Sequence, residues 1–499
     1  MSTWALRRIV IAGGGTAGWM AAAALANTLG GFADITLVES DAIGTIGVGE
    51  STIPPIVLFN NLLGIDETKF MAATQATFKL GIQFDNWTRK GEGYFHSFGT
   101  PGKDHWSAAF HHFWLNGLTR GHDAPFADYS LETVAAMSGR FAHLPDNALN
   151  YAYQFDSSLY AKFLRGMAER DGAVRKEGKI ASVEQDGATG FITALKLESG
   201  ERIEGDLFLD CTGFRALLIG QTLGAPFESW KEWLVCDRAV ALQTETIEPP
   251  VPYTRAIAHD AGWQWRIPLQ HRTGNGLVYA SKYLDDDAAL ALLLANVSGE
   301  VLTKPNFIKF EAGGRPTQWA KNCIAIGLSG GFIEPLESTA IHLIQRAVLR
   351  LLRMLPMSKV SERDIAEFND QQFTDMLQIR DFIILHYKAT ERRDSPMWRY
   401  VADMPIPASL TQKIELFRET GRVFRKNEEL FVDPSWVQVM MGQGITPRAH
   451  HPIAAKLTDQ ELAHFLGSIR DGIAKTASSL PPHADYVAGF CGVAKNAAA

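Results

Sequence analysis

The stretch RRIVIAGGGTAGWMAAAALANTLGG, residues 7–31, decides the fold of the N-terminal part of the chain. Residues 9–12 are apolar, and three glycines separate them from an alanine-rich run that ends at Gly30-Gly31. This order predicts a buried strand, a tight turn and a helix that stops at the glycine pair. The following stretch ADITLVES, residues 33–40, predicts a second strand that ends in Glu39. The chain therefore begins with a predicted βαβ unit.

Gly13, Gly15 and Gly18 give the spacing GxGxxG at the turn of this unit. The glycines permit a tight turn and let the backbone approach a pyrophosphate at the N-terminus of the helix. Glu39, at the end of the next predicted strand, is placed to bind ribose hydroxyls. The pattern predicts a dinucleotide site but does not separate FAD from NAD.

A second glycine-rich turn favours FAD. The stretch AIGLSGGFIEPLESTAIHLIQ, residues 325–345, predicts a strand, a turn at Gly327, Gly330 and Gly331, and a helix starting near Ser338. A second strand–turn–helix suits a long cofactor that is held at both ends, and DLFLDCTGF (206–214) points the same way. No second GxGxxG for NAD(P)H follows, so we expect reduced flavin to come from a separate reductase.

Composition excludes several classes of protein. The 499 residues are 46% hydrophobic and 21% charged with a net charge of −7, which argues against nucleic-acid and membrane partners. The four cysteines are far apart without a CxxC pair, which suits a reducing cytoplasm rather than a disulfide framework. Arg7-Arg8 and the apolar run after them superficially resemble a signal peptide, but the glycines within that run fit a nucleotide turn better.

These patterns predict an α/β fold: a Rossmann-type, hydroxylase-like FAD-binding domain with an additional β-sheet and a helical C-terminal region. Short alternating segments in 176–270 predict the additional sheet, and we place the domain boundary near 350, giving 1–350 and 351–499. An amphipathic helix is expected over 338–355, and Thr458 with Glu461 predicts a capping box. A solvated helix face is expected from Arg346, Arg350 and Arg353.

The stretch GWQWRIPL, residues 262–269, alternates Trp263, Trp265 and Ile267 with polar residues, which predicts a strand with one apolar face. Pro268 cannot donate to a ladder, so the strand ends there or lies at an edge. Two indoles on one face fit either ordinary core packing or a rigid wall beside a site.

The chain resembles the flavin-dependent halogenases of the tryptophan-halogenase type over about residues 1–450. The motifs GGGTAGWMAA (13–22), WxWxIP in GWQWRIPL, and GFIEPLEST (331–339) carry the resemblance, and WxWxIP is the most specific of them. In that family FADH2 and O2 give a flavin hydroperoxide, halide attacks it, and hypohalous acid then halogenates an aromatic ring. The resemblance implies that Trp263 and Trp265 keep the organic substrate away from the flavin.

Two residues inherit catalytic roles by this resemblance. Lys79, in FKLGIQF, falls where the family has its essential lysine, although alone it would be read as a surface residue. Its amine would hydrogen-bond hypohalous acid or become a haloamine, and Glu337 would orient the electrophile and take the ring proton. The amides of Thr339 and Ala340 would bind halide, where the family often has glycine in place of Ala340. A positive φ there would make alanine unfavourable.

The resemblance also implies substrate and cofactor contacts. His96 and Phe98 would flank an indole ring, with Trp436 on the C-terminal side. No tyrosine occurs between Tyr400 and Tyr486, where tryptophan-specific members hold the amino-acid end, so we expect indole or a substituted indole. We expect bromide to be favoured over chloride because it is easier to oxidise. Besides the residues already named, cofactor contacts are expected at Thr16, Ala17, Gly49, Ser51, Gly327, Phe332 and Ile341.

Alternative functions remain open at this stage. A flavin-dependent aromatic monooxygenase would oxidise its substrate without halide, and a non-catalytic flavin-binding protein would not need Lys79. His111-His112 and His450-His451 lack the spacing of a metal site, so we expect no metal. The sequence leaves the natural substrate, the reductase and the oligomeric state open, a homodimer included.

Overall fold

The computed structural model describes residues 6–43, 49–356 and 359–497. By the proximity of Cα atoms the chain divides into two compact units, each assembled from three separate stretches. The domain boundary that the sequence indicates near residue 350 remains a prediction. The first unit comprises Met1–Ala76, Phe155–Leu234 and Phe310–Leu377, and the second comprises Thr77–Gln154, Val235–Lys309 and Gln378–Ala499.

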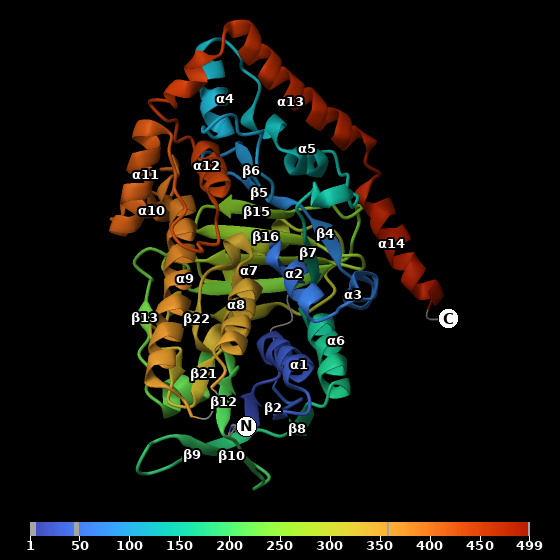
Figure 1. The fold of residues 1–499 in the computed structure, drawn as a ribbon, viewed down its shortest axis with the longest axis vertical. Helices are drawn as coiled ribbons and strands as arrows, with labels where there is room; N and C mark the ends of the chain where they lie inside the picture. Colours follow the sequence, from blue (N-terminus) through green and yellow to red (C-terminus); the bar gives the residue numbers. More distant parts are fainter. Residues whose placement is uncertain (1–5, 44–48, 357–358, 498–499) are drawn as a thin grey trace. The chain divides into compact units, whose positions relative to one another are not determined.

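The first unit is organised around a six-stranded sheet (Figure 1). Strand β1 (Arg8–Ala12) lies between β2 (Asp34–Glu39) and β12 (Leu207–Asp210) and is parallel to both. Helix α1 (Thr16–Leu29) connects β1 to β2 and packs against α6 (Ser157–Arg170), so the βαβ unit predicted from residues 7–40 is confirmed. The remaining strands of this sheet are β8 (Val174–Glu177), β20 (Trp319–Ala320) and β21 (Cys323–Ala325).

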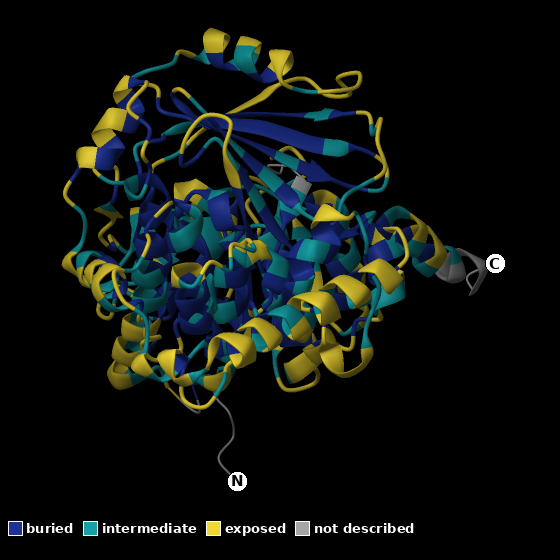
Figure 2. Cartoon of the chain, turned by 90° about the horizontal axis from the view of Figure 1, so that it is seen from above, coloured by how far each residue is buried: buried dark blue, intermediate teal, exposed yellow. Residues whose placement is uncertain are grey.

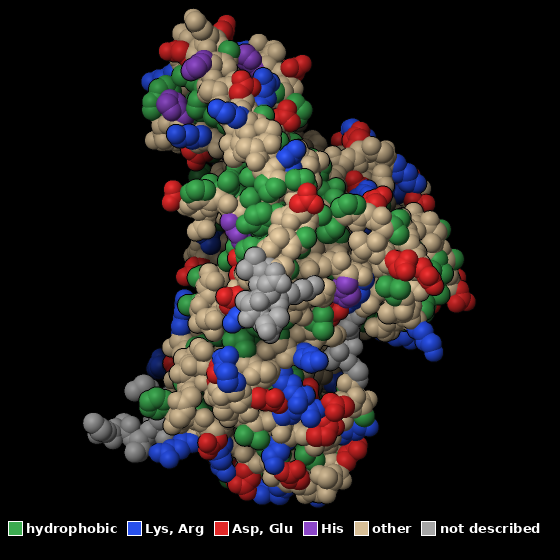
Figure 3. Space-filling view, turned by 90° about the vertical axis from the view of Figure 1, so that its right-hand side faces the viewer, with side chains coloured by type: hydrophobic (Ala, Val, Ile, Leu, Met, Phe, Trp, Pro, Cys, Tyr) green, Lys and Arg blue, Asp and Glu red, His purple; other side chains and the backbone are tan. Residues whose placement is uncertain are grey.

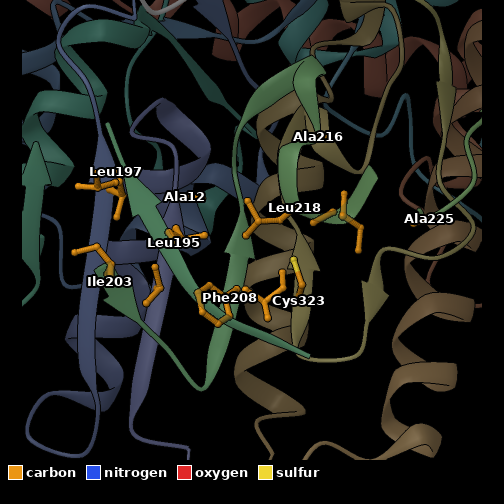
Figure 4. Close-up of a cluster of buried hydrophobic side chains, with 14 residues drawn as sticks. Ala12, Leu195, Leu197, Ile203, Phe208, Ala216, Leu218, Ala225 and Cys323 are labelled. Atoms are coloured by element: carbon orange, nitrogen blue, oxygen red, sulfur yellow. The ribbon is translucent and has the colours of Figure 1, made fainter. Parts of the chain in front are cut away.

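A smaller antiparallel sheet packs on the six-stranded one. Its Leu195, Leu197 and Ile203 form one buried cluster with Phe208 and Cys323 of the larger sheet (Figure 4). These are among the short strands that the alternation in 176–270 predicted. The smaller sheet consists of β9 (Ile180–Gln185), β10 (Ile192–Leu197) and β11 (Arg202–Glu204), and the unit also holds β3 (Gly49–Ser51), β13 (Glu228–Ser229), β19 (Gly313–Gly314) and β22 (Gly331–Phe332).

The second unit is built on a seven-stranded sheet in the order β18-β14-β17-β16-β15-β5-β6. Its neighbours are antiparallel except β5 and β15, which are parallel. A separate antiparallel pair joins β4 to β7. The bounds are β4 (Thr77–Lys79), β5 (Gly81–Asp85), β6 (Gly93–Ser97), β7 (Ala152–Asp156), β14 (Arg238–Thr244), β15 (Thr254–His259), β16 (Gly262–Pro268), β17 (Thr273–Tyr279) and β18 (Asn306–Lys309).

Strand β16 carries the two tryptophans and ends at Pro268, as predicted. The opposite face of this strand is also covered, because Gln264 is fully buried. Gln264 lies opposite Leu277 in register, and Leu277 packs against helix α7 (Asp286–Ala295). The expected strand with one buried face is therefore buried on both faces.

The described residues from 359 onward are helical or irregular, which confirms the predicted helical C-terminal region. Helix α13 begins with the predicted capping box of Thr458 and Glu461. Figure 2 shows exposed residues along the outer sides of the helices and buried ones through the strands. The helix bounds are α2 (Pro55–Leu62), α3 (Glu67–Thr74), α4 (Phe110–Thr119), α5 (Leu131–Met137), α8 (Ala340–Arg353), α9 (Glu362–Lys388), α10 (Pro396–Asp403), α11 (Ala408–Thr420), α12 (Asp433–Gly442), α13 (Asp459–Ser479) and α14 (His483–Ala497).

Helix α8 is shorter than predicted, and one of its faces differs from the expectation. It starts at Ala340 because Ser338 adopts a left-handed φ of 59°, and it ends at Arg353. Arg350 is buried, since its guanidinium donates to Asp375 of α9 at 2.8 Å, and Arg346 donates to the same carboxylate at 3.0 Å. The predicted solvated arginine face is therefore wrong at these two positions.

On the side drawn in Figure 3, Lys and Arg side chains are interspersed with Asp and Glu. Among the described residues, no helix combines the length and the apolar character that a membrane span needs.

Candidate active site

The first glycine turn is tight enough to exclude side chains at two of its positions. Gly13 has a φ of +107°, and a Cβ there would lie 2.3 Å from the carbonyl oxygen of Cys211. A Cβ on Gly18 would lie 1.9 Å from the carbonyl oxygen of Gly13. The glycines of GxGxxG thus serve the tight turn and the close packing of helix on strand that the motif requires.

The N-terminus of α1 is open in the way that a diphosphate site requires. Gly15 is the N-cap, no described side chain caps the helix, and its first turn has no acidic residue. Apart from the neighbours of Gly15 in the chain, no atom of the described residues lies within 4 Å of a Cβ placed on it. Unsatisfied amides and the helix dipole at such an end attract anions, so the turn fits the diphosphate of FAD.

Glu39 lies beside this turn, and its carboxylate is paired with an arginine. A Cβ on Gly14 would lie 1.5 Å from Oε2 of Glu39, so the carboxylate occupies the space that only a glycine leaves. Its Oε1 accepts from Nε of Arg175 at 2.6 Å. The Glu39 carboxylate is therefore fixed by an arginine of β8 that the sequence pattern did not indicate, which orients it for the expected ribose contact.

Two glycine substitutions should separate folding from cofactor binding. Gly15→Ala should fold with an unchanged melting temperature, because the space is open, but should raise the Kd for FAD at least about tenfold by entering the space expected for the diphosphate. Gly18→Ala should instead destabilise the fold by about 1–3 kcal/mol through its backbone clash. Thermal melting and FAD fluorescence titration measure both effects. Unchanged FAD affinity in Gly15→Ala would contradict this placement of the diphosphate.

The second glycine turn lies against the first. Gly327 has a φ of +76°, and a Cβ there would lie 2.9 Å from Cβ of Ala17 in the first turn of α1. Helix α8, whose second residue is Ile341, also packs on α1. Phe332 forms aromatic contacts with Phe214 and Phe310 at 5.4 and 4.8 Å between ring centroids. The structure thus brings the two predicted glycine sites together within the first unit.

The segment 337–340 forms a second helix start with anion-binding character. Glu337 is fully buried, and Thr339 is the N-cap of α8, with no side-chain cap from the described residues and no acidic residue in the first turn. The Thr339 hydroxyl is buried and no described residue hydrogen-bonds to it, which leaves it available to a ligand. The left-handed residue is Ser338, not Ala340, so alanine at 340 brings no backbone strain.

Lys79 is fully buried on β4, in contrast to the surface lysine that its sequence alone suggests. Its Nζ lies 5.1 Å from the centroid of the Phe98 ring, within cation–π range. Phe98 is itself only partly buried. The structure thus places two of the predicted site residues next to each other in the second unit.

His96 and Trp436 lie in a different aromatic cluster of the same unit. The His96 ring is 5.6 Å from the Phe382 ring, and the Trp436 ring packs edge-on against Phe382 at 4.8 Å. Phe431 stacks on Phe382 at 3.7 Å. Trp436 is 1% exposed, and its indole N–H donates to Glu429 at 3.1 Å. Phe382 and Phe431 complete this cluster, and no motif in the sequence marked them.

Trp263 and Trp265 lie on the same face of β16 with ring centroids 6.2 Å apart. Trp263 is 1% exposed and packs near Trp87 at 6.4 Å, while Trp265 lies directly over Gly276, where a Cβ would meet its ring at 2.0 Å. The pair is therefore held rigidly, by an aromatic neighbour on one side and a glycine on the other.

The predicted histidine pairs come together without forming a metal site among the described residues. His111 and His112 have ring centroids 4.1 Å apart, and the His451 amide donates to Nδ1 of His112 at 3.2 Å. Burial, with His111, His451 and Arg422 nearby, lowers the pKa of His112 to about 3. Burial also lowers the pKa of His111. His111 and His112 therefore form a buried pair of adjacent histidines.

A family model described as tryptophan halogenase matches residues 8–459. The chain belongs to the tryptophan halogenase family. A solved flavin-dependent halogenase from Xanthomonas campestris is 56% identical, with a TM-score of 0.96 over 98% of this chain and 99% of that one. BrvH, a flavin-dependent halogenase from Brevundimonas sp. BAL3, is 44% identical, with a TM-score of 0.94 over 97% and 99%.

Among curated relatives, the 7-chloro-L-tryptophan 6-halogenase KtzR from Kutzneria sp. (strain 744) is 36% identical over 97% of this chain and 100% of its own length. As a member of this family, the chain is a flavin-dependent enzyme that works with a separate flavin reductase. The α/β fold with an FAD-binding Rossmann-like core, expected from the sequence, is confirmed by the same structures.

Proposed function

We propose that this tryptophan halogenase family member halogenates an indole-type aromatic by electrophilic substitution, using FADH2 from its reductase, O2 and halide. When bound, reduced FAD supplies, together with O2, the oxidising equivalents that convert halide to hypohalous acid. The observation that carries the proposal is the fully buried Lys79 amine beside the Phe98 ring. Lysine is the basic side chain that proteins use as a reactive group in buried positions, which supports this role.

The start of α8 is proposed to hold the halide. The amides of Thr339 and Ala340 stand at an uncapped helix N-terminus, where an anion is stabilised by unpaired N–H groups and by the helix dipole. The Thr339 hydroxyl, to which no described residue hydrogen-bonds, supplies a further donor. A separate set of residues is proposed to bind FAD. It comprises Gly13, Gly15, Gly18, Gly327 and Glu39, together with Thr16, Ala17, Gly49, Ser51, Phe332 and Ile341.

Lys79 and Glu337 are proposed to carry the substitution. Lys79 donates a hydrogen bond to the oxygen of hypohalous acid, or takes the halogen as a haloamine. The oxygen–halogen bond breaks, the halogen bonds to a ring carbon, and the hydroxide leaves as water after it is protonated. Glu337 then accepts the proton that the ring carbon releases, which restores aromaticity. Trp263 and Trp265 are proposed to keep the organic substrate away from the flavin.

His96, Phe98 and Trp436 are proposed to hold the aromatic substrate, and free indole should be preferred to tryptophan. The region from 401 to 485 has no tyrosine to bind an amino-acid backbone. Each missing hydrogen bond to a charged group forfeits about 1.5–3 kcal/mol, or roughly ten- to a hundredfold in affinity. Without that anchor, halogenation should fall mainly on the electron-rich C3 of indole.

A competition of indole against tryptophan, run separately in bromide and in chloride and read by mass spectrometry, tests this preference. We expect halogenated indole to dominate and bromide to react faster than chloride, because bromide is easier to oxidise. Clean single-position chlorination of tryptophan, with indole ignored, would show that another segment holds the amino-acid end.

A flavin-dependent aromatic monooxygenase is the second candidate function, since it would use the same FAD site. It differs in that its product forms without halide and carries oxygen in place of halogen. Halide omission therefore separates the two functions in one experiment.

A further inference from the structure

His483 is a buried histidine that neither the motifs nor the proposed mechanism uses. It begins helix α14, which lies beside strand β4 in the second unit (Figure 1), and its side chain is fully buried. The backbone at the start of α14 is hydrogen-bonded to the segment 139–141. The His483 amide donates to the Gly139 carbonyl at 2.8 Å, and the Phe141 amide donates to the Pro481 carbonyl at 3.2 Å. These two hydrogen bonds fix the backbone that carries the imidazole.

Both imidazole nitrogens of His483 are bonded to backbone groups. The Phe78 amide donates to Nε2 at 3.2 Å, and Nδ1 is 2.6 Å from the Pro250 carbonyl oxygen, to which it donates. This pattern of one acceptor and one donor requires a neutral ring of a single tautomer. Burial lowers the pKa of His483 to about 4, so the ring stays neutral at physiological pH.

Phe78 directly precedes Lys79 on β4, a strand at the edge of its sheet. Strand β4 pairs with β7 along one edge, and His483 satisfies the Phe78 amide. On the other side of the lysine, the Leu80 amide donates to the Pro252 carbonyl at 2.8 Å. Pro250 is bonded to the same imidazole. The residues on both sides of Lys79 are therefore hydrogen-bonded, Phe78 to His483 and Leu80 to the segment 250–252.

We propose that His483 is a positioning residue that fixes the Lys79 amine through the backbone amide of Phe78. The inference rests on the proposed catalytic role of Lys79. A displacement of about 1 Å in a reacting group can reduce a rate about a hundredfold, so a bond one residue from the lysine can control turnover without touching substrate.

Two polar variants separate the two imidazole bonds. In His483→Gln the amide oxygen reaches the position of Nε2 and can accept from Phe78. In His483→Asn the shorter amide occupies the position of Nδ1, so it can donate to Pro250 but cannot reach the Phe78 amide. Tyr486→Phe is the matched control, because it removes the two hydrogen bonds that the hydroxyl of Tyr486, on the same helix, makes with His143. It keeps the aromatic ring that lies near the Phe78 ring and leaves the bond of the Phe78 amide in place.

The readouts are kcat and KM for indole, and hydrogen–deuterium exchange of the peptide that contains Phe78, measured in the protein without flavin. We expect His483→Asn to lower kcat about tenfold or more with little change in KM, and to speed exchange of that peptide. His483→Gln and Tyr486→Phe should stay within about threefold of the wild type in kcat.

Equal kcat values for His483→Asn and Tyr486→Phe, or an equal loss in His483→Gln and His483→Asn, would overturn the inference. A Lys79→Ala arm keeps the two proposals distinct. If Lys79→Ala retains turnover, the proposed function of the lysine fails; if it is inactive while His483→Asn is fully active, only the positioning role fails.

Discussion

Replacing Lys79 with alanine is expected to lower halogenation by about a thousandfold or more while FAD binding survives. Lys79 is buried on β4 of the second unit, whereas the glycine turns proposed for FAD belong to the first. Losing the amine therefore removes the proposed carrier of the electrophile without altering the cofactor turns. Product formation by mass spectrometry and FAD titration by fluorescence measure the two properties on the same preparation.

Lys103→Ala, at an exposed lysine of the same unit, is the matched control and should leave both properties unchanged. Glu337→Gln should slow the reaction less completely, about ten- to a hundredfold, because a ring cation can lose its proton to other acceptors. Full turnover by Lys79→Ala would mean that the mechanism of the family does not operate here.

Acidification is expected to destabilise the second unit through His112. The pKa of His112 is about 3 in the folded protein, lowered mainly by burial, against 6.5 for the free side chain. The unfolded state therefore binds more protons between these values, so stability is retained above pH 6.5 and is lost as the pH falls below it. The loss from this one residue should reach roughly 2 kcal/mol at pH 5.

His112→Asn keeps an acceptor for the His451 amide but does not titrate, so its stability should fall less steeply between pH 7 and pH 5. Guanidinium unfolding at the two pH values measures the difference. His464→Asn, at an exposed histidine, should behave like the wild type. An identical pH dependence in His112→Asn and in the wild type would exclude His112 as the source of acid sensitivity.

The parts of the fold that depend on local sequence were predictable. The strand, glycine turn and helix of residues 8–29 follow from apolar runs and glycine spacing, and the Thr458 capping box follows from two residues three positions apart. The end of β16 at Pro268 follows from the missing amide of proline. Each of these features is determined by neighbours in the chain.

Features set by tertiary partners could not be read from the sequence. Arg350 fits a solvated helix face until Asp375 of α9 is known to lie beside it. Lys79 reads as a surface residue until its burial is seen, and only the family resemblance indicated otherwise. His483 follows Lys79 by about four hundred residues and belongs to no motif, so its bond to Phe78 left no signal in the sequence.

The central claim, halogenation of an indole-type aromatic, is tested most directly by one reaction. The purified protein is supplied with FAD, a flavin reductase, NADH, O2 and indole, with bromide or without halide, and the products are separated by mass spectrometry. We expect a monobrominated indole with the isotope doublet of bromine, absent when bromide is left out and absent with Lys79→Ala. An oxygenated indole that forms equally with and without halide would contradict it.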